Sequence, residues 1–90
     1  MATKEFNGHR SWNAWNVALW IGNDEGLYNT AREAWNIACR KTRAPGNRTR
    51  ILNRATNILM HYLDGERTPD GAKYNRLCVR EALDGLELSV

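Results

Sequence analysis

Residues 47–65 read NRTRILNRATNILMHYLDG and carry the most regular apolar pattern of the 90-residue chain. Apolar side chains recur every three or four positions there, at Ile51, Leu52, Ala55, Ile58, Leu59, Tyr62 and Leu63. This spacing places them along one face of an amphipathic α-helix. Asn47 or Thr49 can cap the start of the helix, and Gly65 ends it. The stretch therefore predicts a helix that buries one face against other helices.

The sequence before this helix predicts two more. Ser11 is an N-cap candidate for a short, tryptophan-rich helix, which Gly22 and Asn23 end. Asp24 can cap a second helix that runs to about Lys41. The apolar face of the second helix carries Leu27, Ala31, Ala34, Trp35 and Ala38. A Pro-Gly turn then separates it from the third helix.

A fourth helix is predicted after the third. Thr68 and Pro69 form a typical start, a capping residue followed by proline at the first helical position. We expect this helix to end near Gly85. Its apolar positions are Tyr74, Leu77, Cys78, Val79, Ala82 and Leu83.

These patterns together predict the fold class. The chain is expected to be all-α, a small single-domain bundle of about four helices whose first helix is short and Trp-rich. The domain covers residues 1–90, with an N-terminal arm at residues 1–10 and a short tail at residues 86–90 that docks on the bundle or frays. The core is expected to contain Leu52, Ala55, Leu59 and Tyr62, with Trp15 and Trp35 as its aromatic centre.

Composition and cysteine content indicate a cytoplasmic protein. The chain has four tryptophans, and each can bury about 150–250 Å², so a core can form without disulfides. Cys39 and Cys78 fall on apolar helical positions and are expected to be reduced thiols, because a secreted domain of this size usually carries four or more cysteines. The sequence shows no apolar run of 18 residues and no signal-peptide pattern, so we expect no membrane partner.

The sequence holds no catalytic or metal-binding motif. The plausible zinc ligands are Cys39, Cys78, His9 and His61. None of them has the close pair spacing of zinc sites, and no oxyanion-hole motif accompanies a Cys–His pair. Asp64, Glu66 and Asp70 surround a turn and are expected to be solvated. We therefore expect no enzyme activity, no metal and no cofactor.

One segment is a candidate functional site because basic residues are concentrated in it. The segment contains Arg40, Lys41, Arg43, Arg48, Arg50 and Arg54. No acidic residue occurs from position 34 to position 63, so no neighbour in the sequence neutralises them. Guanidinium groups bind phosphate and carboxylate in a bidentate manner. We expect the partner-binding residues here. Three interpretations stay open: a solvated helix end, contact with a nucleic-acid backbone, and contact with an acidic protein surface.

The Trp-rich first helix is the second unusual feature. Trp12, Trp15 and Leu19 share one face, whereas Trp20 lies nearer to Trp12 and Asn16. Four large side chains cannot all be buried along one narrow face of a short helix. The helix is therefore either central in the bundle, which we favour, or partly exposed to a partner. In the second case Trp12 and Trp20 form a candidate secondary surface.

Residues 7–28, NGHRSWNAWNVALWIGNDEGLY, resemble a pattern found in small phage and mobile-element proteins. The shared core reads Trp-Asn-Val-x-Leu-Trp-Ile-x-Asn-Asp-Glu-Gly-Leu-Tyr, and residues 68–71, TPDG, followed by a helix, also recur in that group. The resemblance implies phage or prophage origin, and hence the cytoplasm of a bacterial host cell, without implying a mechanism.

Small phage proteins without catalytic motifs commonly block a host complex. We therefore expect a non-enzymatic phage-type inhibitor of a bacterial defence complex, in its sharpest form an anti-CRISPR protein that blocks a Cas complex. The expected partner is a host protein or ribonucleoprotein complex. One alternative is a small nucleic-acid-binding accessory or regulatory protein that uses residues 40–54. Another is a structural or assembly protein that acts by self-association, so the oligomeric state stays open.

Overall fold

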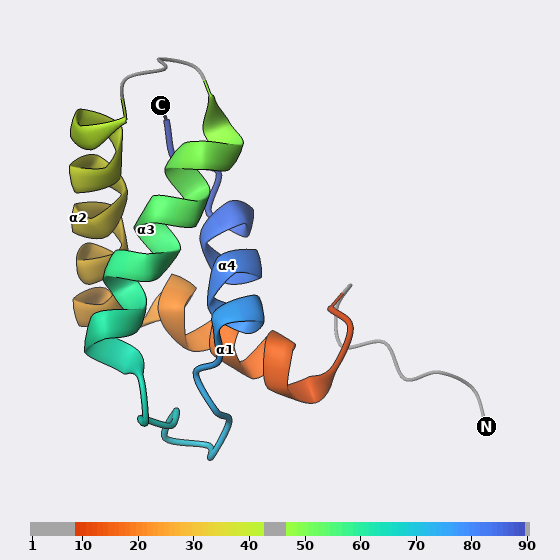
Figure 1. Ribbon diagram of the computed structural model, residues 1–90. Coiled ribbons are helices and arrows are strands. Elements are labelled where there is room, and N and C mark those ends of the chain that lie inside the picture. The colour runs from red at the N-terminus through yellow and green to blue at the C-terminus, as the bar shows by residue number, and fades with distance from the viewer. Residues whose placement is uncertain (1–8, 43–46, 90) are drawn as a thin grey trace.

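A computed structural model of the chain describes residues 9–42 and 47–89 and shows four α-helices (Figure 1). The helices are α1 (Trp12–Asn23), α2 (Glu25–Lys41), α3 (Arg48–Leu63) and α4 (Arg76–Gly85). The predicted all-α class is confirmed. Within residues 9–42 and 47–89, no helix is both long enough and apolar enough to cross a bilayer.

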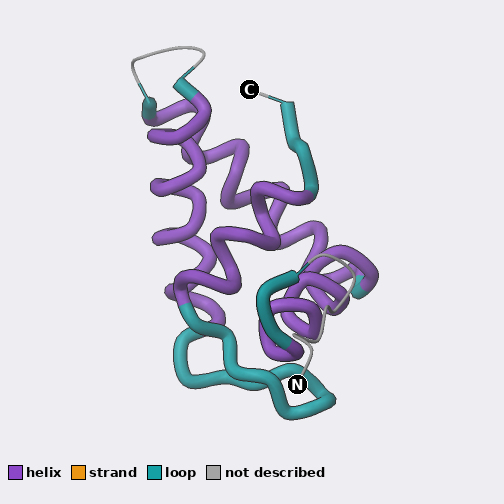
Figure 2. Tube along the Cα trace, turned by 90° about the vertical axis from the view of Figure 1, so that its right-hand side faces the viewer, coloured by secondary structure: helices purple, strands orange, loops and turns teal. Residues whose placement is uncertain are grey.

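The helices form a bundle in which α3 lies between α2 and α4. Following the chain in Figure 1, α2 runs upward, α3 downward and α4 upward again. The helix α1 crosses the lower end of the bundle and contacts both α4 and α2 (Figures 1 and 2). Of the four described helices, the first and the fourth in sequence therefore pack against each other.

Each helix begins at a side chain that accepts a hydrogen bond from a backbone N–H three residues later. The four capping residues are Ser11, Asp24, Asn47 and Asn75. These oxygens satisfy N–H groups that have no partner inside the helix. The caps at Ser11 and Asp24 were predicted from the sequence, and Asn47 was one of the two candidates, with Thr49, for the third helix. The cap at Asn75 was not predicted.

The buried core confirms most of the apolar pattern of α3. Leu52, Ala55 and Leu59 are buried, and so is Trp35 of α2. Tyr62 was predicted to be in the core, but its side chain is 66% exposed. Tyr62 lies at the edge of the apolar face of α3, beside a hollow between α2 and α3, rather than under a neighbouring helix. Trp15, which we expected at the aromatic centre, is half-buried.

The fourth helix starts eight residues after the predicted cap at Thr68. The chain makes a tight turn at residues 68–71, where the N–H of Gly71 donates to the carbonyl of Thr68 at 2.8 Å. Gly71 has a φ of 98°, which helices do not tolerate and which glycine adopts readily. Proline in the second position and glycine in the fourth are equally typical of a β-turn. The predicted helix start is therefore wrong, and α4 begins at Arg76.

Two of the apolar positions assigned to the fourth helix differ from the prediction. Tyr74 lies in the loop before α4, where its side chain is buried. This burial raises the pKa of its hydroxyl, and the negative charges of Asp24 and Glu66 add to the effect. Leu77 lies on the outer face of α4 and is 48% exposed.

The tail docks on the bundle. The indole Nε1 of Trp35 donates to the carbonyl of Ser89 at 2.6 Å, and Arg48 donates to the carbonyl of Leu88 at 3.0 Å. Leu86 and Leu88 pack, partly buried, against the core. Residues 86–89 therefore lie along α2 instead of fraying.

Candidate functional site

The structure brings most of the predicted basic residues to one end of the bundle. Arg40 and Lys41 are exposed in the last turn of α2, and Arg50 and Arg54 are exposed on the first half of α3. The end of α2 and the start of α3 lie together at the top of Figure 1. We call Arg40, Lys41, Arg50 and Arg54 the basic corner. Arg43 lies outside the described residues.

Arg48 differs from the other predicted partner-binding residues because it makes contacts within the protein. Its guanidinium lies 5.0 Å from the centroid of the Trp35 ring. It also donates to the carbonyl and the Oδ1 of Asp84, both at 3.2 Å, and to the carbonyl of Leu88. The expectation that no acid neutralises it is wrong, because Asp84 is 36 residues away in sequence but adjacent in space. Arg48 therefore fixes the tail to α2 and α3 and is not a free cation.

The basic corner has little internal compensation. In the part of the chain that the structure describes, the ion pairs are Arg10–Glu81 and Arg48–Asp84, and neither includes a residue of the corner. Arg40 and Lys41 are favoured by the negative end of the α2 dipole. Arg50 has no such benefit, because it lies in the first turn of α3, where the dipole favours anions.

Only one of the two residues of the candidate secondary surface, Trp12 and Trp20, is free to contact a partner. Trp12 is 40% exposed. The indole Nε1 of Trp20, in contrast, donates to Oδ2 of Asp70 at 2.8 Å, and Nδ2 of Asn16 donates to the same oxygen at 2.9 Å. Oδ1 of Asn16 accepts a hydrogen bond from the hydroxyl of Thr68 at 2.6 Å. Trp20 therefore has an internal role, which is to hold the turn at residues 68–71 on α1.

These hydrogen bonds also change the chemistry of Asp70. The bonds from Asn16 and, to a smaller extent, from Trp20 lower the pKa of its carboxyl group, because they stabilise the ionised form. We expected Asp70 to be simply solvated. Its side chain instead joins α1 to the loop before α4.

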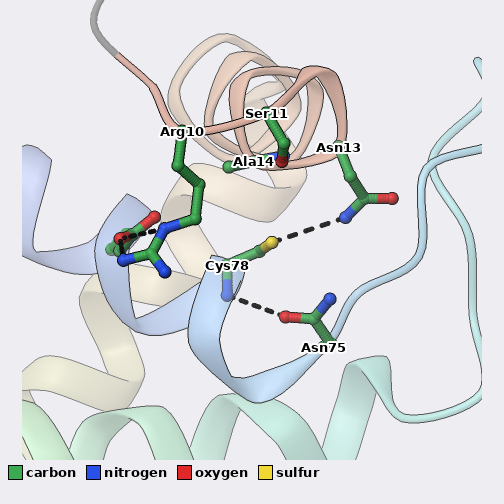
Figure 3. A network of polar contacts seen from close by, with 7 residues as sticks. Arg10, Ser11, Asn13, Ala14, Asn75 and Cys78 are labelled. Atoms are coloured by element: carbon green, nitrogen blue, oxygen red, sulfur yellow. Dashed lines mark hydrogen bonds and ion pairs between the residues drawn. The ribbon is translucent and has the colours of Figure 1, made fainter. Parts of the chain in front are cut away.

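Asn13 is another residue of α1 that contacts this loop. Its side-chain amide donates to the carbonyl of Lys73 at 2.9 Å and accepts from the N–H of Lys73 at 2.8 Å. The same Nδ2 lies 3.4 Å from Sγ of Cys78 (Figure 3). Asn13, Asn16 and Trp20 follow a spacing of three and four residues along one face of α1. That spacing was visible in the sequence, but its partner segment was not.

Both cysteines are free thiols, Cys39 half-buried in α2 and Cys78 buried in α4. Over residues 9–42 and 47–89, no three His, Cys, Asp or Glu side chains are grouped so that they could hold a metal ion.

A protein family of unknown function, DUF7249, matches residues 2–87 of the chain. The chain belongs to this family. No curated protein and no solved structure matches it. The matched region of this DUF7249 protein includes both stretches quoted for the resemblance, residues 7–28 and 68–71. In the structure these two stretches touch each other through Asn16, Trp20 and Asp70.

Two arginines of this DUF7249 protein extend the positive surface beyond the predicted segment. Arg76 and Arg80 lie one turn apart on α4, and Nε of Arg80 donates to Oδ1 of Asn53 on α3 at 2.8 Å. Arg76 lines a hollow of about 540 Å³ with residues of α3. Both arginines lie outside the basic segment at residues 40–54, so their proximity along the chain gives no sign of them. Only the packing of α4 on α3 brings them to the same surface.

Proposed function

We propose that this DUF7249 protein is a non-catalytic docking protein that contacts an anionic surface of a partner through its basic corner. The observation that carries this proposal is the exposure of four cations at one end of the bundle, outside the two ion pairs of the described residues. Arginine is over-represented where proteins bind phosphate or carboxylate groups, because its fork of N–H donors matches both.

Folding alone does not account for the corner. Exposed charges contribute little to stability, and Arg50 lies at the helix end where a positive charge is least favoured. A cluster of like charges also repels itself. An anionic partner would relieve this repulsion and would gain a contact from each cation.

The narrower form of the proposal is a phage-type inhibitor of a bacterial defence complex, in particular of the CRISPR–Cas kind. It is motivated by the resemblance of residues 7–28 to small phage and mobile-element proteins. A ribonucleoprotein complex presents phosphate groups and acidic side chains, and both are complementary to the corner. Capture of Cas subunits from lysate by the wild-type protein, lost in the variant described next, would support this form.

A triple charge reversal, Arg40→Glu/Lys41→Glu/Arg50→Glu, tests the role of the corner. We expect normal folding, because these side chains are exposed, and a large loss of partner capture from a bacterial lysate, because attraction becomes repulsion at each position. The matched control is Arg32→Glu/Lys73→Glu/Arg67→Glu, which changes the net charge equally at exposed positions outside the corner. If the corner variant folds and still captures the partner at full strength, or if both triple variants lose it equally, the corner is not the docking site.

A further inference from the structure

The packing of α4 on α3 produces a positive face larger than the basic corner. Along the outside of α3, residues 50, 54, 57 and 61 follow one another at three- or four-residue spacing and are all exposed. They supply two guanidinium groups, one amide and one imidazole. From α4, Arg76 and Arg80 face the same side, because Arg80 contacts Asn53 and Arg76 lines the hollow with α3. We call this surface the α3–α4 face.

The acidic residues of α4 do not cancel this charge. Glu81 pairs with Arg10, which precedes α1, and Asp84 pairs with Arg48 at the first residue of α3. Arg54, Arg76 and Arg80 are absent from the ion pairs of the described residues. Asp64 lines the hollow together with Arg76, and Asp64 and Glu66 line a second hollow beside Arg76, so two carboxylates border the positive face there.

The dimensions of the face fit an extended polyanion. From Arg50 to His61 the helix rises by roughly 16 Å, since each residue adds about 1.5 Å. A DNA duplex rises by about 3.4 Å per base pair, so this length corresponds to about five base pairs of DNA. The N-terminal end of α4, at Arg76, adds the partial positive charge of its helix dipole.

The side chains of the face favour backbone contacts over base stacking. The hollow is lined by Asn57, Met60, His61, Asp64 and Arg76, none of which is Phe, Tyr or Trp. The exposed Tyr62 lies on the other side of α3, where it lines a separate hollow with Ile37 of α2. Proteins that hold single strands use large aromatic rings as stacking platforms, whereas duplex backbones are bound by arginine and amide groups.

We propose that the α3–α4 face binds the phosphate backbone of a double-stranded nucleic acid. This inference rests on the proposed docking function and names the chemistry of its partner. Arg54 and Arg76 contact phosphates from two helices. Arg50 lies one turn before Arg54 on α3, and Arg80, which donates to Asn53, lies between Arg76 and that end of α3. DNA and RNA duplexes share this backbone chemistry, and the two arms of the experiment separate them.

The test is a salt series of binding to labelled duplexes of about 20 base pairs, one of DNA and one of RNA, followed by fluorescence anisotropy. Four phosphate contacts predict a slope of log affinity against log salt of about −3.6, so affinity should fall roughly 150-fold from 50 to 200 mM salt. A single Arg54→Glu or Arg76→Glu variant should weaken binding at low salt and reduce the slope by about one. Arg54→Lys should retain most of the slope, because the charge is kept.

The matched control is Arg32→Glu, which reverses a cation that lies 5.9 Å from the Tyr28 ring centroid, off the α3–α4 face. It should leave the salt slope unchanged. The inference is overturned if neither duplex binds at low salt, if a single strand of the same sequence binds more tightly than both, or if Arg32→Glu weakens binding as much as Arg54→Glu does. If the duplexes fail to bind while the basic-corner triple variant still loses its partner in lysate, the docking function stands and its partner surface is acidic protein.

Discussion

At the scale of the residue, the exposed carboxylate of Asp70 holds the loop before α4 against α1. Its Oδ2 accepts hydrogen bonds from the side chains of Asn16 and Trp20, and both donors belong to α1. These bonds hold the ionised carboxylate in the folded protein and are lost on unfolding. They therefore couple the stability of the protein to pH.

The Asp70→Asn variant tests this coupling. Because the pKa of Asp70 is lowered from 3.8 on folding, its stabilisation is fully present above that value and is lost as pH falls through the lower folded pKa. At about pH 7 the variant should melt at a lower temperature than wild type, and the difference should shrink below about pH 4. Melting curves recorded at a series of pH values measure it. Other carboxylates titrate in both proteins, so a difference that stays constant into acid would show that Asp70 is not the group responsible.

Leu59 and Tyr62 give a contrast between two apolar residues of the same helix. Leu59 is fully buried, so Leu59→Ala should cost about 2–5 kcal/mol of unfolding free energy through lost burial and a residual cavity. Tyr62→Ala, at a mostly exposed position, should change stability by only about 0.5 kcal/mol. Urea denaturation of the two variants makes the comparison. Equal losses would mean that Tyr62 is covered in solution, as it would be in a self-associated form.

At the scale of the element, local sequence predicted the starts of α1 and α2 and narrowed the start of α3 to Asn47 or Thr49. The caps at Ser11, Asp24 and Asn47 depend on neighbours three residues away, so the sequence contains all that decides them. The start of α4 could not be predicted in this way, because Thr-Pro opens both helices and turns. The contact between Thr68 and Asn16, 52 residues away, helps to hold the turn in place.

The reactivity of the two cysteines reports whether α1 and α4 remain packed together. Cys78 is buried in α4, with Nδ2 of Asn13 at 3.4 Å, whereas Cys39 lies half-buried on α2. A thiol reagent should therefore modify Cys39 first, and Cys78 only when α1 and α4 separate. In an Asn16→Ala variant, which loses contacts to Thr68 and Asp70, we expect faster modification of Cys78 and an unchanged rate at Cys39. Mass spectrometry over time resolves the two sites, and equal acceleration at both would indicate global unfolding.

At the scale of the whole molecule, the positive surface depends on packing that the sequence does not display. The corner residues could be predicted because they follow one another along the chain. Arg48 is removed from the exposed positive surface by its contact with Asp84, and Arg76 and Arg80 are added to that surface by the packing of α4. Both changes depend on contacts between residues 27 or more positions apart. Charge clusters in a helical bundle are therefore only partly encoded by proximity in sequence.

The packing of α1 against the loop before α4 has a consequence for synthesis on the ribosome. Asn13 and Asn16 are translated before the groups they bind, which lie 60 and 54 residues later in the chain. At about 5–20 residues per second, translation needs roughly 3–12 s to supply those groups. During this interval the amides and indoles of the nascent α1 have only water or a chaperone as partners. The contacts that complete α1 thus become available only after α2 and α3 have been translated.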